Sequence, residues 1–149
     1  MDAKITGASG AIPRDNSNKM TAHANLYYEE IRKRDSDIES IAQNTGFSFE
    51  DIKNIKNHIF FNEYDLGDEF PERFAPDFDM AVSWQRLSEG NNIHEMDIVL
   101  LNHELIEYKL MEKGTSYKEA HKIASKSYNY KKYTDELDKK FKERGLPNE

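Results

Sequence analysis

Residues 96–111 read MDIVLLNHELIEYKLM and form the most apolar long stretch of the chain. Placed at 100° per residue, as an α-helix requires, apolar side chains fall on nearly all sides of this stretch. Such a helix is usually central in its domain. Gly114 can end it, and Ser116-Tyr-Lys-Glu119 is a capping box that starts another helix directly afterwards. We therefore expect a central antiparallel helix hairpin over residues 95–130 or thereabouts.

Two polar side chains interrupt the apolar arc of the first helix. His103 and Glu107 are four positions apart and share a face, so they lie together on one side of the helix. The arc around them is formed by Met96, Val99, Leu100, Leu110 and Met111. An unpaired buried polar group costs on the order of 2–7 kcal/mol. The pair must therefore be hydrogen-bonded, bind a metal ion or face a pocket.

A third titratable side chain lies on the apolar face of the following helix. His121 comes seven residues after Gly114, and Glu107 comes seven residues before it. At 1.5 Å per residue, both lie about 10 Å from the turn. We expect His103, Glu107 and His121 to converge, with Glu104 on the flank of the same face.

Three interpretations of this constellation remain open. In the first, His103, Glu107 and His121 bind a divalent metal ion and Glu104 activates a water molecule as base. In the second, a histidine poised by a carboxylate performs metal-free acid–base catalysis. In the third, the side chains form a buried hydrogen-bond network that only fixes the helix register. The string His103-Glu-Leu-Ile-Glu107 is not HExxH, so a zinc-protease assignment fails as written.

The remaining sequence predicts an all-α fold of about six helices in one domain. Residues 1–16 are expected to be a flexible linker, and residues 17–149 the helical domain. A long loop over about residues 62–77 contains Gly67, Pro71 and Pro76, and a small hairpin from Tyr64 to Phe74 is possible there. The candidate helix N-caps are Ser17, Ser36, Ser48, Asp77, Ser116 and Thr134.

Composition excludes several classes of protein. The chain of 149 residues has no cysteine, so disulfides, thiolate metal sites and cysteine nucleophiles are impossible. No apolar run approaches the roughly 20 residues that span a bilayer, and the N-terminus lacks a signal-peptide stretch. The net charge of −7 does not favour long-range attraction to nucleic acid, although a nuclease with segregated charge stays possible.

Several basic or titratable side chains lie outside the hairpin's inner face. Arg73, Arg86 and Lys122 are candidate substrate-binding residues, with a structural salt bridge as the alternative for Arg73. A nuclease would need a basic groove near Lys118, Lys122 and Lys126, but a lysine run is more often a solvated helix face. His58 lies opposite the apolar stripe of its predicted helix and is expected to be exposed.

Short motifs distributed from Ala22 to Tyr130 resemble a domain found at the C-terminal end of Gram-positive phage minor-head proteins and polymorphic-toxin proteins. They are His23-Ala-Asn-Leu-Tyr-Tyr-Glu-Glu-Ile-Arg32, Ile41-Ala-Gln-Asn-Thr-Gly-Phe47, Ile55-Lys-Asn-His58, Arg73-Phe-Ala-Pro76, Ser83-Trp-Gln-Arg-Leu87, Leu100-Leu-Asn-His-Glu104 and Glu119-Ala-His121. The positions that match the recurring pattern are His58, Arg73, Trp84, Arg86, His103, Glu104, Glu107 and His121. The resemblance transfers no biochemical role to any of them.

The resemblance implies an antibacterial effector delivered into a target cell and paired with an immunity protein. We expect it to act in the cytoplasm and to reach the target without a classical signal peptide. A hydrolase is the expected activity, first a nuclease acting on RNA or DNA and second a metal-dependent hydrolase of another substrate. The alternative is a non-catalytic helical module, such as a phage structural adaptor or an inhibitor of a host protein.

Overall fold

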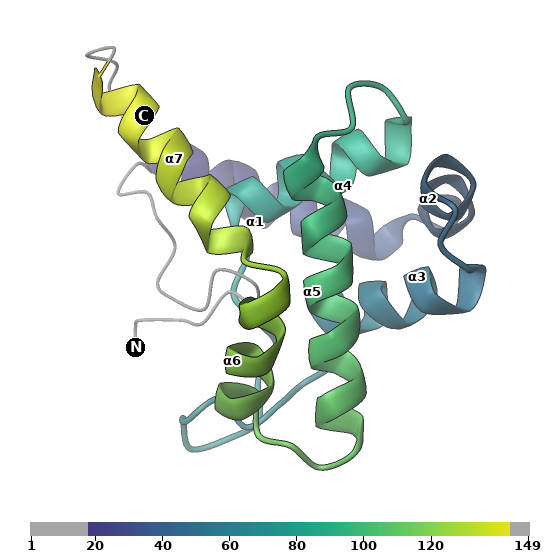
Figure 1. The fold of residues 1–149 in the computed structure, drawn as a ribbon, viewed down its shortest axis with the longest axis vertical. Coiled ribbons are helices and arrows are strands. Elements are labelled where there is room, and N and C mark those ends of the chain that lie inside the picture. The colour runs from purple at the N-terminus through teal and green to yellow at the C-terminus, as the bar shows by residue number, and fades with distance from the viewer. Residues whose placement is uncertain (1–17, 144–149) are drawn as a thin grey trace.

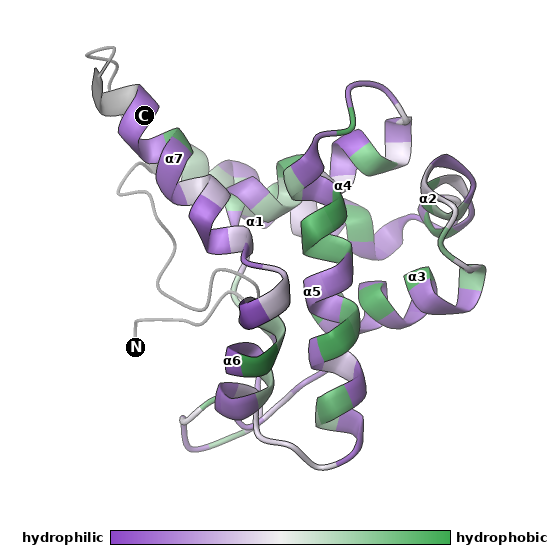
Figure 2. Ribbon diagram, in the orientation of Figure 1, coloured by the Kyte–Doolittle hydropathy of each residue, from purple (hydrophilic) through white to green (hydrophobic). Residues whose placement is uncertain are grey.

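Helix α5 (Glu95–Glu112) lies at the centre of the fold, as its nearly all-round apolar pattern predicts. It contacts α3, α4, α6, α7 and the turn that follows α3. Figure 1 shows this computed structural model, which describes residues 18–143, with α6 running back alongside α5. Figure 2 shows the hydrophobic bands of α5 interrupted by hydrophilic ones partway along the helix.

The described residues form one all-helical domain, as the sequence predicts, with no β-strand. It has seven α-helices rather than about six. The helices are α1 (Asn18–Lys33), α2 (Asp37–Thr45), α3 (Phe49–Lys56), α4 (Phe78–Glu89), α5 (Glu95–Glu112), α6 (Tyr117–Ser127) and α7 (Tyr130–Glu143). The predicted linker over residues 1–16 and the predicted cap Ser17 lie outside the described residues.

Three of the predicted helix caps are confirmed by their hydrogen bonds. Ser48 Oγ accepts from the backbone N–H of Asp51 at 3.0 Å, and Asp77 Oδ1 accepts from that of Met80 at 3.0 Å. Ser116 Oγ accepts from the backbone N–H of Glu119 at 3.2 Å and starts α6. Ser36 precedes α2 but makes no side-chain cap hydrogen bond.

The prediction that Thr134 caps the last helix is wrong. Helix α7 already begins at Tyr130, where Asn129 Oδ1 accepts from the backbone N–H of Lys132 at 3.1 Å. Thr134 lies inside the helix, and its hydroxyl donates to the carbonyl of Lys131 at 3.0 Å. Asparagine caps helices at least as readily as threonine does, and Asn129 lies directly before the first residue of α7.

The third helix changes its geometry at the point where it approaches α5. Helix α3 ends at Lys56, and Asn57–Phe61 (η2) form a π-helical turn. Its wider hydrogen bond runs from the backbone N–H of Asn62 to the carbonyl of Asn57 at 2.7 Å. Single π turns are frequent at functional sites, because they turn side chains away from α-helical positions. Here the turn lies beside α5 and α1.

The loop after this turn crosses the molecule to reach α4 and passes the start of α6 (Figure 1). Within it, Tyr64 and Glu72 form one antiparallel bridge through two backbone hydrogen bonds of 2.9 Å. The predicted hairpin between Tyr64 and Phe74 is therefore reduced to a single bridge. Phe74 is buried and its ring packs against Tyr117 of α6 at 5.3 Å, which ties the loop to the helix pair.

Candidate metal centre

Glu107 lies at the meeting point of three histidines from three different elements. Its Oε1 is 2.8 Å from Nε2 of His58 in η2. Its Oε2 is 3.1 Å from Nε2 of His103 on α5 and 3.1 Å from Nδ1 of His121 on α6. The predicted convergence of His103, Glu107 and His121 is thus present, and a third imidazole joins it. We call the group His58, His103, Glu104, Glu107 and His121 the His/Glu cluster.

The charge state of Glu107 follows from these neighbours. The side chain is fully buried, and burial by itself raises a carboxyl pKa. Hydrogen bonds from His103, His121 and His58 outweigh this burial and hold the pKa of Glu107 well below its usual range. Glu107 is therefore an ionised carboxylate, and it presents its oxygens to three imidazoles.

The second ring nitrogen of His103 is fixed by the backbone. Nδ1 lies 2.9 Å from the carbonyl oxygen of Tyr128, the residue after α6. A carbonyl only accepts, so Nδ1 carries a proton, and Nε2 is the nitrogen that faces Glu107 and that a bound cation would use. Metal-binding histidines are usually held in this way, with one N–H on a backbone carbonyl and the other nitrogen toward the ion.

The prediction that His58 is exposed is wrong. Its side chain has no exposed surface, and Nδ1 lies 2.7 Å from the hydroxyl of Tyr64 in the long loop. The prediction assumed that this face of the helix meets solvent, whereas the long loop packs the rings of Tyr64 and Phe74 against His58, with centroids 5.1 and 5.2 Å away. The periodicity of the sequence held no signal for this histidine, although the motif Ile55-Lys-Asn-His58 belongs to the family resemblance.

The Tyr64 hydroxyl that holds His58 is itself positioned by a neighbour. Asn62 Nδ2 donates to it at 2.9 Å. Burial raises the pKa of Tyr64 to about 12, against the opposing hydrogen bond from Asn62. The phenol is thus neutral near pH 7 and can either accept from His58 Nδ1 or donate to it.

A second carboxylate lies beside the first. Glu104 is fully buried on α5, and its Oε1 is 3.4 Å from the same His58 Nε2 that contacts Glu107. Two carboxylates near one imidazole nitrogen repel each other at low dielectric unless a proton or a cation lies among them. Glu104 thus lies near Glu107, and the contact that places it there is with His58 of η2.

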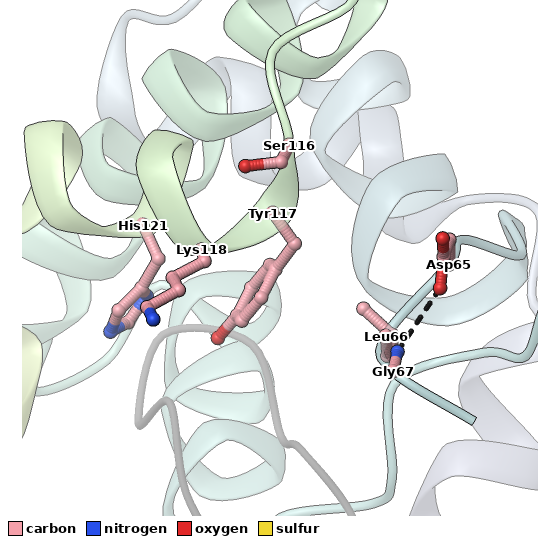
Figure 3. A pocket seen from close by; sticks show the side chains of 7 residues that line it. All are labelled: Asp65, Leu66, Gly67, Ser116, Tyr117, Lys118 and His121. Atoms are coloured by element: carbon pink, nitrogen blue, oxygen red, sulfur yellow. Dashed lines mark hydrogen bonds between the residues drawn. The ribbon is translucent and has the colours of Figure 1, made fainter.

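His121 connects the cluster to the surface. Its side chain is 22% exposed, whereas those of His103 and Glu107 are fully buried. It lines a pocket of about 410 Å³ between the start of α6 and the loop, together with Asp65, Leu66, Gly67, Ser116, Tyr117 and Lys118. Figure 3 shows His121, Lys118 and Tyr117 on the α6 side and the loop residues across the pocket.

Tyr117 forms the wall of this pocket next to His121. The two rings stack with centroids 5.3 Å apart and an interplanar angle of 28°. Burial raises the pKa of Tyr117, and the negative charges of Glu107 and Glu104 raise it further. Its hydroxyl is therefore a neutral phenol near pH 7, suited to donating a hydrogen bond to a ligand in the pocket.

The distances within the cluster fit a small divalent cation. A tetrahedral zinc ion with bonds of about 2.0–2.1 Å holds neighbouring ligand atoms about 3.3 Å apart. His103 Nε2 and His121 Nδ1 each lie 3.1 Å from Glu107 Oε2. The candidate ligand atoms of these three residues all lie within 4.8 Å of one another, and so do those of His58, Glu104 and Glu107. Two imidazoles and a carboxylate are also a ligand set that catalytic zinc sites use.

The structure does not bring the three predicted substrate-binding residues together. Arg86 forms a bidentate ion pair with buried Asp97, with bonds of 2.8 and 2.7 Å, near the start of α5. Arg73 is exposed on the long loop, and Lys122 is exposed on α6. The cationic side chain that lines the pocket is Lys118, one turn before Lys122.

The fold and the cluster together define an all-helical domain with a buried His/Glu centre that reaches the surface through one histidine. No protein-family model, no curated protein and no solved structure matches the chain. No helix in the described part of the chain is long and apolar enough to cross a membrane.

Proposed function

We propose that this chain is a metal-dependent hydrolase domain in which His103, Glu107 and His121 hold a divalent cation. The observation that carries the proposal is the position of His121, which contacts Glu107 Oε2 inside the protein and lines a surface pocket outside it. An ion held there would have protein ligands on its inner side and an open position toward the pocket. Catalytic metal sites require such an open position, whereas structural sites close it.

The residues around the ion have separate roles in this proposal. A bound Zn²⁺ ion would lower the pKa of a water ligand to about 7. Glu104 accepts the proton of that water at a carboxylate oxygen, because it is buried beside the ligands and is not one of the three. Tyr117 donates from its phenol to the substrate oxygen that becomes negative, and its stacked ring orients His121.

The proposed biological role is that of an antibacterial effector. The support is the resemblance of the motifs from Ala22 to Tyr130 to C-terminal effector domains, which also implies an immunity protein. Lys118 at the pocket and the exposed Lys122 and Lys126 on α6 favour an anionic substrate, and we propose RNA or DNA. Asp65 on the opposite wall of the pocket limits how much phosphate backbone can approach from the loop side.

Expression in bacteria with and without His103→Ala tests the effector proposal. We expect growth arrest with the native chain and normal growth with the variant, since His103 supplies one proposed ligand. His94→Gln is the matched control, because His94 is exposed at the start of α5 and outside the cluster. Equal toxicity of the native chain and His103→Ala would contradict an enzymatic role for the cluster.

A non-catalytic binding module remains the second candidate, and one observation favours it. Glu107 is fully buried and already accepts hydrogen bonds from three histidines, as a purely structural network would require. Metal analysis separates the candidates. Stoichiometric metal that is lost in Glu107→Gln supports hydrolysis, whereas a chain without bound metal that holds a protein partner tightly supports the binding module.

A further inference from the structure

The two oxygens of Glu107 face two different sets of donors. Oε2 faces His103 and His121, at 3.1 Å from each. Oε1 faces the opposite set, at 2.8 Å from His58 Nε2, and the same nitrogen is 3.4 Å from Glu104 Oε1. A carboxylate placed between two groups of nitrogen and oxygen donors has the arrangement of a bridging ligand between two metal ions.

The inner set, His58, Glu104 and Glu107, also contains three candidate metal ligands. His58, Glu104 and Glu107 bring their candidate ligand atoms within 4.8 Å of one another, and all three side chains are fully buried. His58 can present its Nε2 lone pair if Nδ1 donates to the Tyr64 oxygen, which has room to accept from Asn62 as well. This repeats the support of His103 by the Tyr128 carbonyl.

Charge favours cations on both sides of Glu107. Two fully buried carboxylates on adjacent turns of α5 lie near one imidazole nitrogen. Burying like charges together is costly, and coordinated cations offset that cost. The residues that line the pocket include His121 of the outer set and, within the described part of the chain, no member of the inner set.

We propose that the His/Glu cluster binds two divalent cations bridged by Glu107, an outer ion on His103 and His121 and an inner ion on His58 and Glu104. This inference rests on the proposed metal site and changes the role of Glu104 from base to ligand. Each ion receives two residues of its own and shares the bridging carboxylate. Two-metal hydrolases hold their ions about 3.5–4 Å apart and use both on one substrate.

Metal stoichiometry of the full chain provides the test. The protein is stripped with chelator, dialysed against Zn²⁺, desalted and analysed for metal by mass spectrometry. We expect two equivalents in the native chain, one in His58→Gln and one in Glu104→Gln. His23→Gln, outside the cluster on α1, is the control and should keep two. Circular dichroism verifies that each variant keeps its helices.

The other outcomes separate this inference from the proposed function. One equivalent that is kept by His58→Gln and lost by His121→Gln overturns the second ion and leaves the outer site intact. Two equivalents kept by both His58→Gln and Glu104→Gln would place the second ion elsewhere and also overturn the inference. No bound metal in the native chain defeats both proposals.

A measurement on the native chain does not depend on the folding of any variant. With Mn²⁺ in place of Zn²⁺, electron paramagnetic resonance distinguishes ions that share a bridging carboxylate from isolated ones. We expect a spin-coupled spectrum after addition of two equivalents. A spectrum of uncoupled Mn²⁺ at saturation would show that Glu107 does not bridge two ions.

Discussion

Nε2 of His58 lies 2.8 Å from Oε1 of Glu107, although 49 positions separate the two residues in the chain. The contact joins the π turn after α3 to the middle of α5. It adds a third imidazole to the two that α5 and α6 place around the Glu107 carboxylate. The depressed pKa of Glu107 owes part of its shift to this contact, and the proposed second metal position would use the same two atoms.

The stability of the metal-free protein should depend on pH through Glu107. Its pKa is depressed in the folded state, so the carboxylate adds stability above its unfolded pKa of about 4.3, and this stability is lost as the pH falls through the folded value. We expect Glu107→Gln to lower the free energy of unfolding near pH 7. The difference from the native chain should shrink below about pH 4.3. Urea unfolding at successive pH values measures it.

The matched control for this pH profile is Glu112→Gln, on the same helix and exposed. Its effect on unfolding should stay within about 0.5 kcal/mol at every pH, as surface substitutions usually do. A Glu107→Gln profile parallel to that of the native chain down to low pH would contradict the depressed pKa.

Metal should stabilise the folded chain. A ligand that binds only the native state raises the free energy of unfolding by about 2.7 kcal/mol when its free concentration is one hundred times its dissociation constant. For a chain of this size, that corresponds to a rise in Tm of roughly 5–10 °C. Differential scanning calorimetry with Zn²⁺ or with chelator gives the shift. His121→Gln should reduce it, and an identical shift in that variant would remove His121 from the ligand set.

Tyr117→Phe tests the proposed phenol donor without disturbing the metal ligands. The ring and its stacking on His121 remain, so the amount of bound metal should be unchanged. Turnover of a phosphodiester substrate should fall roughly tenfold, which corresponds to about 1.4 kcal/mol and the loss of one hydrogen bond in the transition state. Unchanged turnover, with metal content equal to that of the native chain, would exclude a role for the hydroxyl.

Asp37 should contribute strongly to the stability of the fold, although it is not a member of the His/Glu cluster. Its buried carboxylate accepts from Lys56 Nζ at 2.8 Å and from Trp84 Nε1 at 3.0 Å. Lys56 Nζ donates to Asp37 and to the Arg34 carbonyl. Asp37→Ala removes the charged one of these two acceptors and leaves the buried ammonium group without its counter-charge. We expect a loss of about 3–5 kcal/mol, as for other broken buried pairs.

Chemical denaturation of Asp37→Ala beside Asp35→Ala provides the measurement for this pair. Asp35 is exposed in the connection between α1 and α2, two residues before Asp37, and its removal should cost no more than about 0.5 kcal/mol. Equal effects of the two substitutions would mean that the buried pair adds nothing specific to the fold.

The local parts of this structure were predictable from the sequence. Ser48, Asp77 and Ser116 cap helices through bonds to residues three positions ahead, so the information lies within one turn of chain. The positions of His103, Glu107 and His121 follow from two helical periods and one short turn. A helix wheel and a count of residues on either side of Gly114 are enough to bring them together.

Tertiary structure alone decided the parts that depend on distant segments or on a change of helical period. His58 reaches Glu107 because a π turn forms where α3 meets α5 and because Tyr64 from the loop holds the ring in place. Neither event leaves a repeating pattern in the sequence, since each is selected by packing between segments far apart in the chain. The sequence therefore determined a two-helix cluster of titratable side chains, and folding added the third histidine that surrounds the buried carboxylate.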